Sequence, residues 1–257
     1  MNLQNSTILI TGGSSGIGLE LVKQLTALSG VIIITGRNSD ALDKTKAQFP
    51  NIHTFQSDVS NPRDIELLYK DVIKKFPDLN VIINNAGVMR LIDLQDSTMD
   101  LEGITCEINT NLSGTIQMVH QFLPHLMQQK SAAIVNVSSG IAFMPYSLAP
   151  VYSAAKAGVR AYTQALRLQL EHTGVKVFEI IPPGVKTNLQ NDWAQQPNPN
   201  QMMDVEKMVN VAIKGLLKDT PEIRPFLISI IKAAGRIAPD LLLKFGHTGY
   251  KKFKGQK

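Results

Sequence analysis

The chain has a single cysteine, Cys106, among its 257 residues, so an intramolecular disulfide is excluded. One cysteine provides no zinc cluster either, and its neighbours in sequence predict a small, buried apolar side chain. No apolar run reaches the ~20 residues that a membrane-spanning helix needs. The first six residues are polar and do not resemble a signal peptide. We therefore expect a cytoplasmic protein without a bound metal.

A large excess of charge of one sign is also absent. The formal net charge is +5, and 44% hydrophobic residues with 18% charged residues is typical of a globular protein with a sizeable core. The basic excess is visible at the C-terminus, where lysines recur from Lys244 to Lys257. We favour a solvated tail there over binding to nucleic acid or to anionic lipid. The length fits one α/β domain over residues 1–257.

Short apolar runs alternate with helical segments along most of the chain. This order predicts a doubly wound parallel sheet, Rossmann-like, with helices on both faces. A short further strand is predicted at 222–224. The predicted strands are residues 7–10, 31–35, 53–56, 81–83, 133–137 and 176–181. The predicted helices cover residues 18 to about 28, about 39–49, about 62–76 and 98–127, and a further helix begins at Pro150.

A glycine-rich turn follows the first predicted strand and leads into a helix. In this arrangement backbone N–H groups and a helix N-terminus meet a phosphate, and glycines permit the tight turn and close approach of a pyrophosphate. The turn therefore predicts a dinucleotide site, with its contacts from Gly12, Ser14, Ser15, Gly16, Ile17 and Gly18.

The end of the second predicted strand favours one dinucleotide over another. Gly36 stands where an acidic residue would bind the ribose 2′-hydroxyl, and Arg37 follows as a bidentate partner for a 2′-phosphate. We therefore predict NADP(H) over NAD(H). At the end of the third strand, Asp58 is predicted either to accept from the adenine amino group, with Val59 packed on the ring, or to belong to the start of the next helix.

Small residues and amides follow the fourth strand as Asn84, Asn85, Ala86 and Gly87, a composition that suits a backbone-lined wall for a ribose. Further on, Asn111 lies in an apolar helical stretch. A buried amide there is costly unless it is hydrogen-bonded. The asparagine is predicted to hold a water or to bend the helix; the alternative is a capped helix break near Ser113 and Gly114.

Tyr152 and Lys156 are four residues apart on a predicted helix and so project from one face. Free tyrosine titrates near pH ~10. An ammonium ~4 Å away would favour the phenolate by ~4 kcal/mol at an effective dielectric of ~20, before desolvation is subtracted. We expect this pair to lower the pKa of the phenol toward the range of efficient acid–base catalysis.

These motifs together resemble the short-chain dehydrogenase/reductase family over about residues 7–187. The glycine motif of the family corresponds to Thr11 through Gly18, its NNAG motif to Asn84 through Gly87, and its active-site asparagine to Asn111. The family serine lies thirteen residues before the tyrosine, which selects Ser139. The resemblance implies a catalytic set of Asn111, Ser139, Tyr152 and Lys156.

For mechanism, the resemblance implies interconversion of a carbonyl and an alcohol by hydride transfer. Tyr152 would be the acid or base, and Ser139 would bind the same oxygen. Lys156 would lower the pKa of the phenol and hold the nicotinamide ribose, and Asn111 would position a water. The alternative is a non-catalytic NADP(H)-binding regulator, which would need neither Tyr152 nor Ser139.

Two departures from the family affect the substrate side. Pro182 and Pro183 stand where the family has Pro-Gly, although Val185 and Thr187 remain in register to contact the nicotinamide carboxamide. Residues 188–203, with Trp193, form a predicted substrate loop whose apolar lining favours a moderately hydrophobic small molecule. This pattern is similar to bacterial members named for D-alanylation of lipoteichoic acid, a label that implies no substrate.

The C-terminal residues 225–257 combine an apolar helix with the basic tail. The helix is expected to pack on its own domain. The less favoured alternatives are that it caps the substrate site, forms a subunit interface or contacts a membrane surface. Apolar positions on the helices around 115–127 and 152–171 indicate a homodimer or homotetramer.

Overall fold

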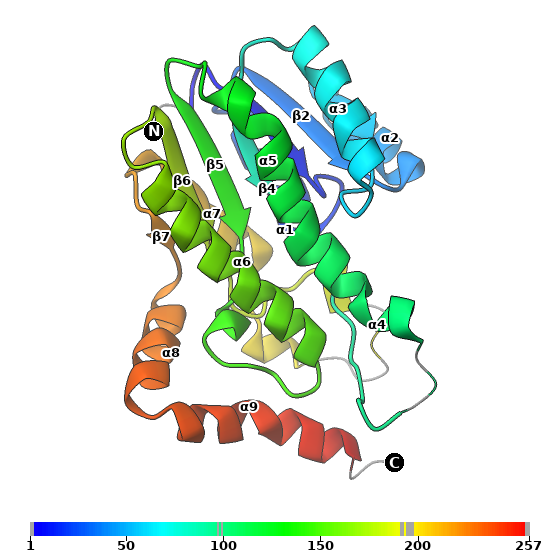
Figure 1. Cartoon of the computed structure of the whole chain (residues 1–257), viewed down its shortest axis with the longest axis vertical. Coiled ribbons are helices and arrows are strands. Elements are labelled where there is room, and N and C mark those ends of the chain that lie inside the picture. The colour runs from blue at the N-terminus through cyan, green and yellow to red at the C-terminus, as the bar shows by residue number, and fades with distance from the viewer. Residues whose placement is uncertain (1–2, 97, 99, 191–192, 194–197, 255–257) are drawn as a thin grey trace.

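The computed structural model describes residues 3–96, 98, 100–190, 193 and 198–254 (Figure 1). These residues form one parallel seven-stranded sheet in the order β3-β2-β1-β4-β5-β6-β7. The predicted doubly wound sheet is confirmed, and the short seventh strand ends one residue earlier than predicted. The strands are β1 (Thr7–Thr11), β2 (Val31–Gly36), β3 (His53–Gln56), β4 (Leu79–Asn84), β5 (Ala132–Val137), β6 (Val175–Ile180) and β7 (Glu222–Ile223).

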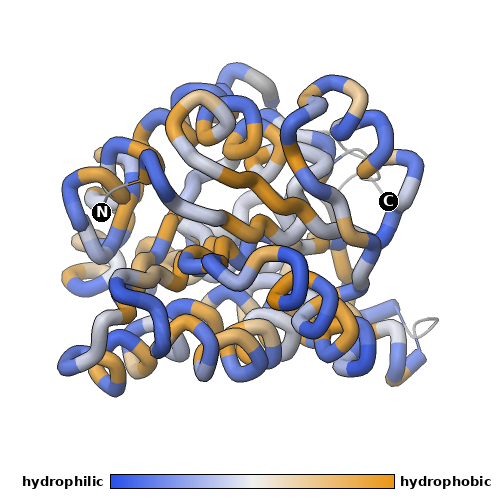
Figure 2. The backbone as a smooth tube through the Cα atoms, turned by 90° about the horizontal axis from the view of Figure 1, so that it is seen from above, coloured by the Kyte–Doolittle hydropathy of each residue, from blue (hydrophilic) through white to orange (hydrophobic). Residues whose placement is uncertain are grey.

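Helices cover both faces of this sheet, and the alternation of side chains along each strand explains why. On β1, Ile8 and Ile10 belong to the core beneath one helix layer, whereas Leu9 belongs to the core beneath the other. The apolar strands consequently lie between two helical layers (Figure 2). The first layer contains α1 (Gly16–Leu25), α2 (Ser39–Gln48) and α7 (Val205–Leu217), and the second contains α3 (Pro62–Lys75), α5 (Gly114–Leu126) and α6 (Pro150–Gln169).

The strand order reverses at β1, which pairs with β2 on one side and with β4 on the other. In open α/β sheets this reversal leaves a crevice at the carboxyl ends of the strands. The segments that follow β1, β4, β5 and β6 all leave the sheet at this edge, and they contain most of the predicted site residues.

The helix predicted over residues 98–127 consists of three parts. Residue 99 lies outside the described residues, and α4 (Leu101–Ile108) is followed by a π-helical turn over Asn109–Ser113 that continues directly into α5. Ser113 has helical dihedral angles and makes no side-chain cap, so the alternative of a capped break is wrong. The π-helical turn widens the helix locally at Asn109–Ser113 and contains Asn111.

Two helices end the chain, α8 (Phe226–Ile237) and α9 (Pro239–Lys254). Gly235 does not interrupt α8, whereas Pro239 begins α9, where its missing N–H is tolerated. In Figure 1 the two helices form an L beneath the carboxyl edge of the sheet. The hydroxyl of Tyr250 donates to Asp93 over 3.0 Å, which ties α9 to the loop after β4. None of the helices described is long and apolar enough to cross a membrane.

Candidate active site

A cavity of about 830 Å³ lies at the carboxyl edge of the sheet. The predicted residues that line it come from the ends of five strands and from α6, so the fold brings together positions up to 175 residues apart. They are Gly12, Ser15, Gly16, Ile17, Arg37, Asn85, Ala86, Gly87, Ser139, Tyr152, Lys156, Pro182, Val185 and Thr187.

The glycine turn at one end of the cavity leaves no room for side chains. Gly12 and Gly16 have φ of +65° and +53°, in the left-handed region that favours glycine. A Cβ on Gly18 would lie 2.1 Å from the carbonyl oxygen of Gly12. The backbone is therefore bare and close to the N-terminus of α1, which fits a pyrophosphate.

Side chains around the turn fix its shape. The Asn85 side chain donates to the carbonyl oxygens of Thr11 and Gly12 over 3.0 and 3.2 Å. The Thr11 hydroxyl accepts from the backbone N–H groups of Asn85 and Ala86, each over 3.0 Å. The Cβ atom of Thr187 lies 3.2 Å from where a Cβ on Gly16 would stand, so the Thr187 side chain also borders the turn. Asn85 thus supports the glycine turn rather than pointing only toward a ligand.

At the end of β2, Gly36 leaves open the position that an acidic residue would fill. The Ser14 hydroxyl lies 3.6 Å from where a Cβ on Gly36 would stand. Arg37 is more than half exposed, and its nearest guanidinium nitrogen is 3.9 Å from the Asp58 carboxylate. Because this ion pair is long and exposed to solvent, it contributes little to fixing the guanidinium. The Arg37 guanidinium therefore remains available to a phosphate.

Asp58 and Val59 do not line this cavity as the structure describes it. One Asp58 oxygen accepts from the backbone and the hydroxyl of Ser60, and Asn61 caps α3. Val59 is buried, and its carbonyl oxygen lies 2.5 Å from where a Cβ on Gly114 would stand. Asp58 thus takes part in the turn before α3, and the adenine contacts remain predictions.

Asn111 is fully buried beside the loop that follows β4. Its side-chain oxygen accepts from the backbone N–H of Val88 over 2.9 Å, and its amide donates to the Val88 carbonyl over 2.8 Å. A Cβ on Gly87 would lie between this oxygen and the Lys156 ammonium, at 3.0 and 3.7 Å. Asn111 therefore clamps the loop directly behind Lys156.

Tyr152 and Lys156 project from the first two turns of α6 into the cavity. Pro150 is the first residue of that helix, as predicted. The Lys156 ammonium donates to the carbonyl oxygen of Val137 over 2.8 Å and lies 5.6 Å from the centre of the Tyr152 ring. Ser139, at the end of β5, also lines the cavity and lowers the pKa of the Tyr152 phenol, against the effect of burial. The phenol, the hydroxyl and the ammonium therefore share one wall of the cavity.

The expected decrease in the phenol pKa is wrong for the protein alone. Burial raises the pKa of Tyr152 above its ordinary value, the hydrogen bond with Ser139 opposes this increase, and the nearby Glu107 carboxylate adds to it. Burial also lowers the pKa of Lys156 to about 8. The expectation assumed an ammonium ~4 Å away and left desolvation out, and desolvation dominates at these buried positions.

Sequence reasoning missed a buried carboxylate near the phenol, which lies beside a half-buried arginine. Glu107 is fully buried on α4. One of its carboxylate oxygens accepts a hydrogen bond from the backbone N–H of Arg90 over 2.8 Å. The other oxygen lies 3.8 Å from the Arg90 guanidinium and has no hydrogen-bond partner. Burial raises the pKa of this carboxyl group, against the effect of Arg90. Glu107 precedes Asn111 by four residues, and that helical spacing was the available signal.

The remaining wall of the cavity is mostly apolar and reaches α8. Cys106 is exposed and lines the cavity, so the expectation of a buried cysteine is wrong: the face of α4 toward the core holds Glu107 instead. The indole N–H of Trp193 donates to the Met89 carbonyl over 3.2 Å. The other residues around it in the predicted substrate loop, 191–192 and 194–197, lie outside the described residues. Apolar residues of this wall are Met89, Ile141, Met144, Trp193, Met202, Leu227, Ile228 and Ile231.

The loop after β6, which contains the two prolines, lines the cavity. The Pro182 carbonyl accepts from the N–H of Gly140 over 2.8 Å, which joins this loop to the one that carries Ser139. Val185 forms a bridge with Met203, and both Val185 and Thr187 line the cavity.

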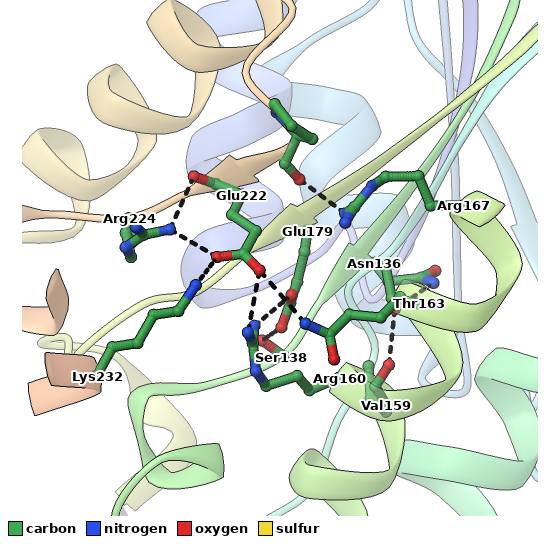
Figure 3. A network of polar contacts seen from close by, with 12 residues as sticks. Asn136, Ser138, Val159, Arg160, Thr163, Arg167, Glu179, Glu222, Arg224 and Lys232 are labelled. Atoms are coloured by element: carbon green, nitrogen blue, oxygen red, sulfur yellow. Dashed lines mark hydrogen bonds and ion pairs between the residues drawn. The ribbon is translucent and has the colours of Figure 1, made fainter. Parts of the chain in front are cut away.

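A network of buried charges connects the Ser139 loop to α8 (Figure 3). The Ser138 hydroxyl donates to Glu179 over 2.6 Å, and Arg160, one turn beyond Lys156, bridges Glu179 and Glu222 over 2.7 and 3.0 Å. The second oxygen of Glu222 accepts from Arg224 over 2.8 Å and from Lys232 of α8. β6, β7, α6 and α8 are thereby held together around the site.

Glu222 gives this network a measurable pH dependence. Burial alone would raise the pKa of Glu222, but hydrogen bonds from Lys232 and Arg160 bring it down to about 2, below the ordinary value of 4.5. Its contribution to stability is therefore complete above pH 4.5 and is lost as the pH falls toward 2. We expect Glu222→Gln to lower the free energy of unfolding at neutral pH by about 2 kcal/mol, less than for a fully buried pair.

Urea unfolding at a series of pH values checks this expectation. Below pH 4.5 the curve of stability against pH should be shallower for Glu222→Gln than for the wild type. Lys176→Gln, which breaks the exposed pair with Asp219, is the control and should change the free energy by less than ~1 kcal/mol. Equal effects of the two substitutions would show that the network contributes no more than a surface pair.

The parallel sheet, the bare glycine turn at its switch point and the Ser–Tyr–Lys cluster beside it together define a dinucleotide-dependent oxidoreductase. The model of the short chain dehydrogenase family matches residues 6–198. The chain belongs to that family.

Relatives and solved structures are in agreement. An uncharacterized oxidoreductase of Bacillus subtilis, DltE, is 40% identical over 249 residues, which cover 96% of this chain and 99% of the relative. A short chain dehydrogenase from Burkholderia cenocepacia in complex with NADP has a TM-score of 0.82 at 22% identity and covers 96% of this chain and 100% of its own. One from Burkholderia phymatum, in complex with NAD, has a TM-score of 0.79 at 19% identity, covering 90% and 94%.

Proposed function

We propose that the protein is an NADP(H)-dependent oxidoreductase that interconverts a carbonyl and an alcohol, with Tyr152 as the proton donor or acceptor. The observation that carries the proposal is that Ser139, Tyr152 and Lys156 line the same cavity, with the Lys156 ammonium held by the Val137 carbonyl 5.6 Å from the centre of the Tyr152 ring. Family membership supports the reaction class. A non-catalytic regulator, the alternative, would leave this cluster unused.

The residues of the chain divide the work of carbonyl reduction. A bound NADPH would supply the hydride to the carbonyl carbon. Tyr152, whose raised pKa keeps the phenol protonated, would donate its proton to the carbonyl oxygen. Ser139 would donate a hydrogen bond to the same oxygen as negative charge develops. Lys156 would hold the ribose hydroxyls and favour the phenolate that remains, until a proton from solvent restores Tyr152.

Arg37 and Ser14 support the choice of NADP(H). Both flank the open position at Gly36, where an added 2′-phosphate meets no carboxylate on β2. A guanidinium there can bind the phosphate through two parallel N–H groups. The glycine turn would hold the pyrophosphate, and Val185 and Thr187 would contact the carboxamide.

Arg37→Ala tests this assignment. We expect it to weaken NADPH binding by roughly 10- to 100-fold, because hydrogen bonds to a charged group are lost, and to change NADH binding much less. Fluorescence titration of both dinucleotides measures the difference. Arg63→Ala, on the exposed start of α3, is the matched control. Equal losses for NADPH and NADH would show that Arg37 does not bind the 2′-phosphate.

A moderately hydrophobic carbonyl compound is the substrate class that the lining supports. Methionine, isoleucine, leucine and tryptophan side chains make up much of the cavity lining. NADPH consumption with a panel of aldehydes, ketones and quinones tests this function. Turnover that rises with the apolar size of the substrate is expected; NADPH binding without turnover of any compound would favour the regulator.

We further propose a homo-oligomer. Apolar side chains remain exposed on the outward faces of α5 and α6, among them Ile116, Met127 and Leu168. The expectation of a cytoplasmic protein stays a prediction.

A further inference from the structure

The helix α8 has two apolar faces, and only one of them is buried by its own protein. The inner face carries Ile228, which is 1% exposed and packs against Gly140, and Ile231, which lines the cavity. The outer face carries Phe226, Ile230 and Ile237, which are spaced by four and seven residues and are 80%, 50% and 84% exposed. Packing on its own domain therefore explains only half of this helix.

The outer face continues onto α9. Leu241 and Phe245 are one turn apart and are 70% and 67% exposed. The opposite side of α9 packs on the protein, where Gly246 lies against the carbonyl oxygen of Pro145 and His247 contacts Ser147 over 3.1 Å. We define the C-terminal apolar face as Phe226, Ile230, Ile237, Leu241 and Phe245.

Charge is segregated in the same segment. Residues 226–257 contain seven lysines and arginines and one aspartate, a net charge of +6, whereas residues 1–225 contain 19 basic and 20 acidic residues, a net charge of −1. Lys244 and Lys251 are exposed on α9, two turns apart, and Arg236 is exposed next to Ile237. The basic excess of the chain therefore lies in the same segment of the sequence as the C-terminal apolar face, although Lys232 is paired with Glu222.

From this combination we propose that α8 and α9 dock on an anionic lipid surface. Large apolar side chains bordered by lysines suit the boundary between headgroups and acyl chains, where apolar area and attraction to anionic lipids both add to binding. Pairing of this face with a second copy would bring together two segments of net charge +6. The phosphates of a nucleic acid would pair with the lysines, but they would also lie against the exposed phenylalanine and isoleucine side chains, which is unfavourable.

The location of α8 relates this surface to the active site. Leu227, Ile228 and Ile231 line the cavity, and Leu227 is also half exposed. A bilayer against the outer face would therefore adjoin the mouth of the cavity. This step rests on the proposed function, because it means that the apolar carbonyl substrate enters from the lipid.

Sedimentation with vesicles tests the docking without any turnover. The probes are vesicles of phosphatidylcholine and vesicles of phosphatidylcholine and phosphatidylglycerol in equal parts, each at low and at high salt. The full chain should sediment with the anionic vesicles at low salt, be released by high salt and remain in solution with the neutral vesicles. Sedimentation with neither kind of vesicle would overturn the proposal.

Two pairs of variants locate the contact. Lys244→Gln with Lys251→Gln should weaken binding by about fivefold for each lysine, or roughly 25-fold for the pair, whereas Lys70→Gln with Lys74→Gln on α3 should have no effect. Phe226→Ser with Ile230→Ser should abolish sedimentation, and Leu67→Ser, an equally exposed site on α3, should not. Binding retained by both C-terminal variants would overturn the proposal. A loss of self-association in place of vesicle binding would assign the face to a second copy.

Turnover of a water-soluble carbonyl keeps the two proposals separate. Phe226, Ile230, Lys244 and Lys251 lie outside the catalytic cavity, so these variants should consume NADPH with such a substrate at the wild-type rate. Vesicle binding without any turnover would contradict only the proposed function, and turnover without vesicle binding only the docking.

Discussion

Tyr152→Phe is expected to lower kcat for carbonyl reduction by about 10²- to 10⁴-fold, the range for loss of a general acid. The substitution removes the phenolic hydroxyl beside Ser139 and keeps the buried ring. The glycine turn, Arg37 and Lys156 are unchanged, so NADPH should bind with nearly the wild-type affinity. Steady-state kinetics and fluorescence titration measure the two effects separately.

Tyr162→Phe is the matched control for this substitution. Tyr162 lies on the same helix and is also partly buried, but it packs in the core of the second helix layer and does not line the cavity. Its loss should leave kcat close to the wild-type value. If Tyr152→Phe reduced carbonyls at the wild-type rate, another group would have to supply the proton.

Lys156→Met should affect both cofactor binding and catalysis. An ammonium ~6 Å from a phenolate at an effective dielectric of ~20 is worth ~3 kcal/mol, so kcat should fall by roughly 10²-fold. NADPH affinity should also fall, because the ribose hydroxyls lose their donor. A decrease in kcat/KM that exceeds the decrease in kcat would express both losses.

The pH dependence of the wild type provides a second readout of this lysine. Burial lowers the pKa of Lys156 to about 8, so the side chain is charged below that pH and becomes neutral as the pH rises through it. The Lys156-dependent part of kcat should therefore decline above about pH 8, and the decline should be absent in Lys156→Met. Thermal unfolding of both proteins checks that the fold is retained, since the variant also leaves the Val137 carbonyl without its donor. A variant with the wild-type pH profile would contradict the role of the lysine.

The sheet could be predicted because its signals are local. Most strands of the parallel sheet, though not β3 and β7, are apolar runs closed by a turn, and each predicted strand agrees with the structure within two residues at either end. The same locality identified the glycine turn and the Tyr152–Lys156 spacing. The assembly of these residues in one cavity followed from the rule that ligands bind at the carboxyl edge of such sheets.

Contacts between distant parts of the chain could not be predicted in this way. Arg160, Glu179 and Glu222 look like ordinary surface charges in the sequence, and only the pairing of β6 with β7 brings them into one buried network. The prediction of a buried Cys106 was wrong for a related reason. The direction in which each side chain of α4 points depends on a helix start that contains no strong periodic signal.

The phenol pKa shows why local spacing does not determine electrostatics. The spacing of Tyr152 and Lys156 correctly placed a positive charge near the ring, but it contained no information on burial or on Glu107. Both raise the pKa, which favours a protonated phenol and hence a proton donor. The outer apolar face of α8 was likewise hidden, because the sequence does not tell which side of an apolar helix its own domain covers.

Deuterium transfer tests the central claim most directly. The protein should be incubated with NADPH deuterated at C4, in both stereochemical forms, and with the best carbonyl of the panel, and the alcohol should be analysed by mass spectrometry. The account predicts that one form places a deuterium on the carbinol carbon and that Arg37→Ala slows the transfer at limiting NADPH. An alcohol without deuterium from either form would show that no hydride passes from the dinucleotide to the carbonyl, which would contradict the proposed function.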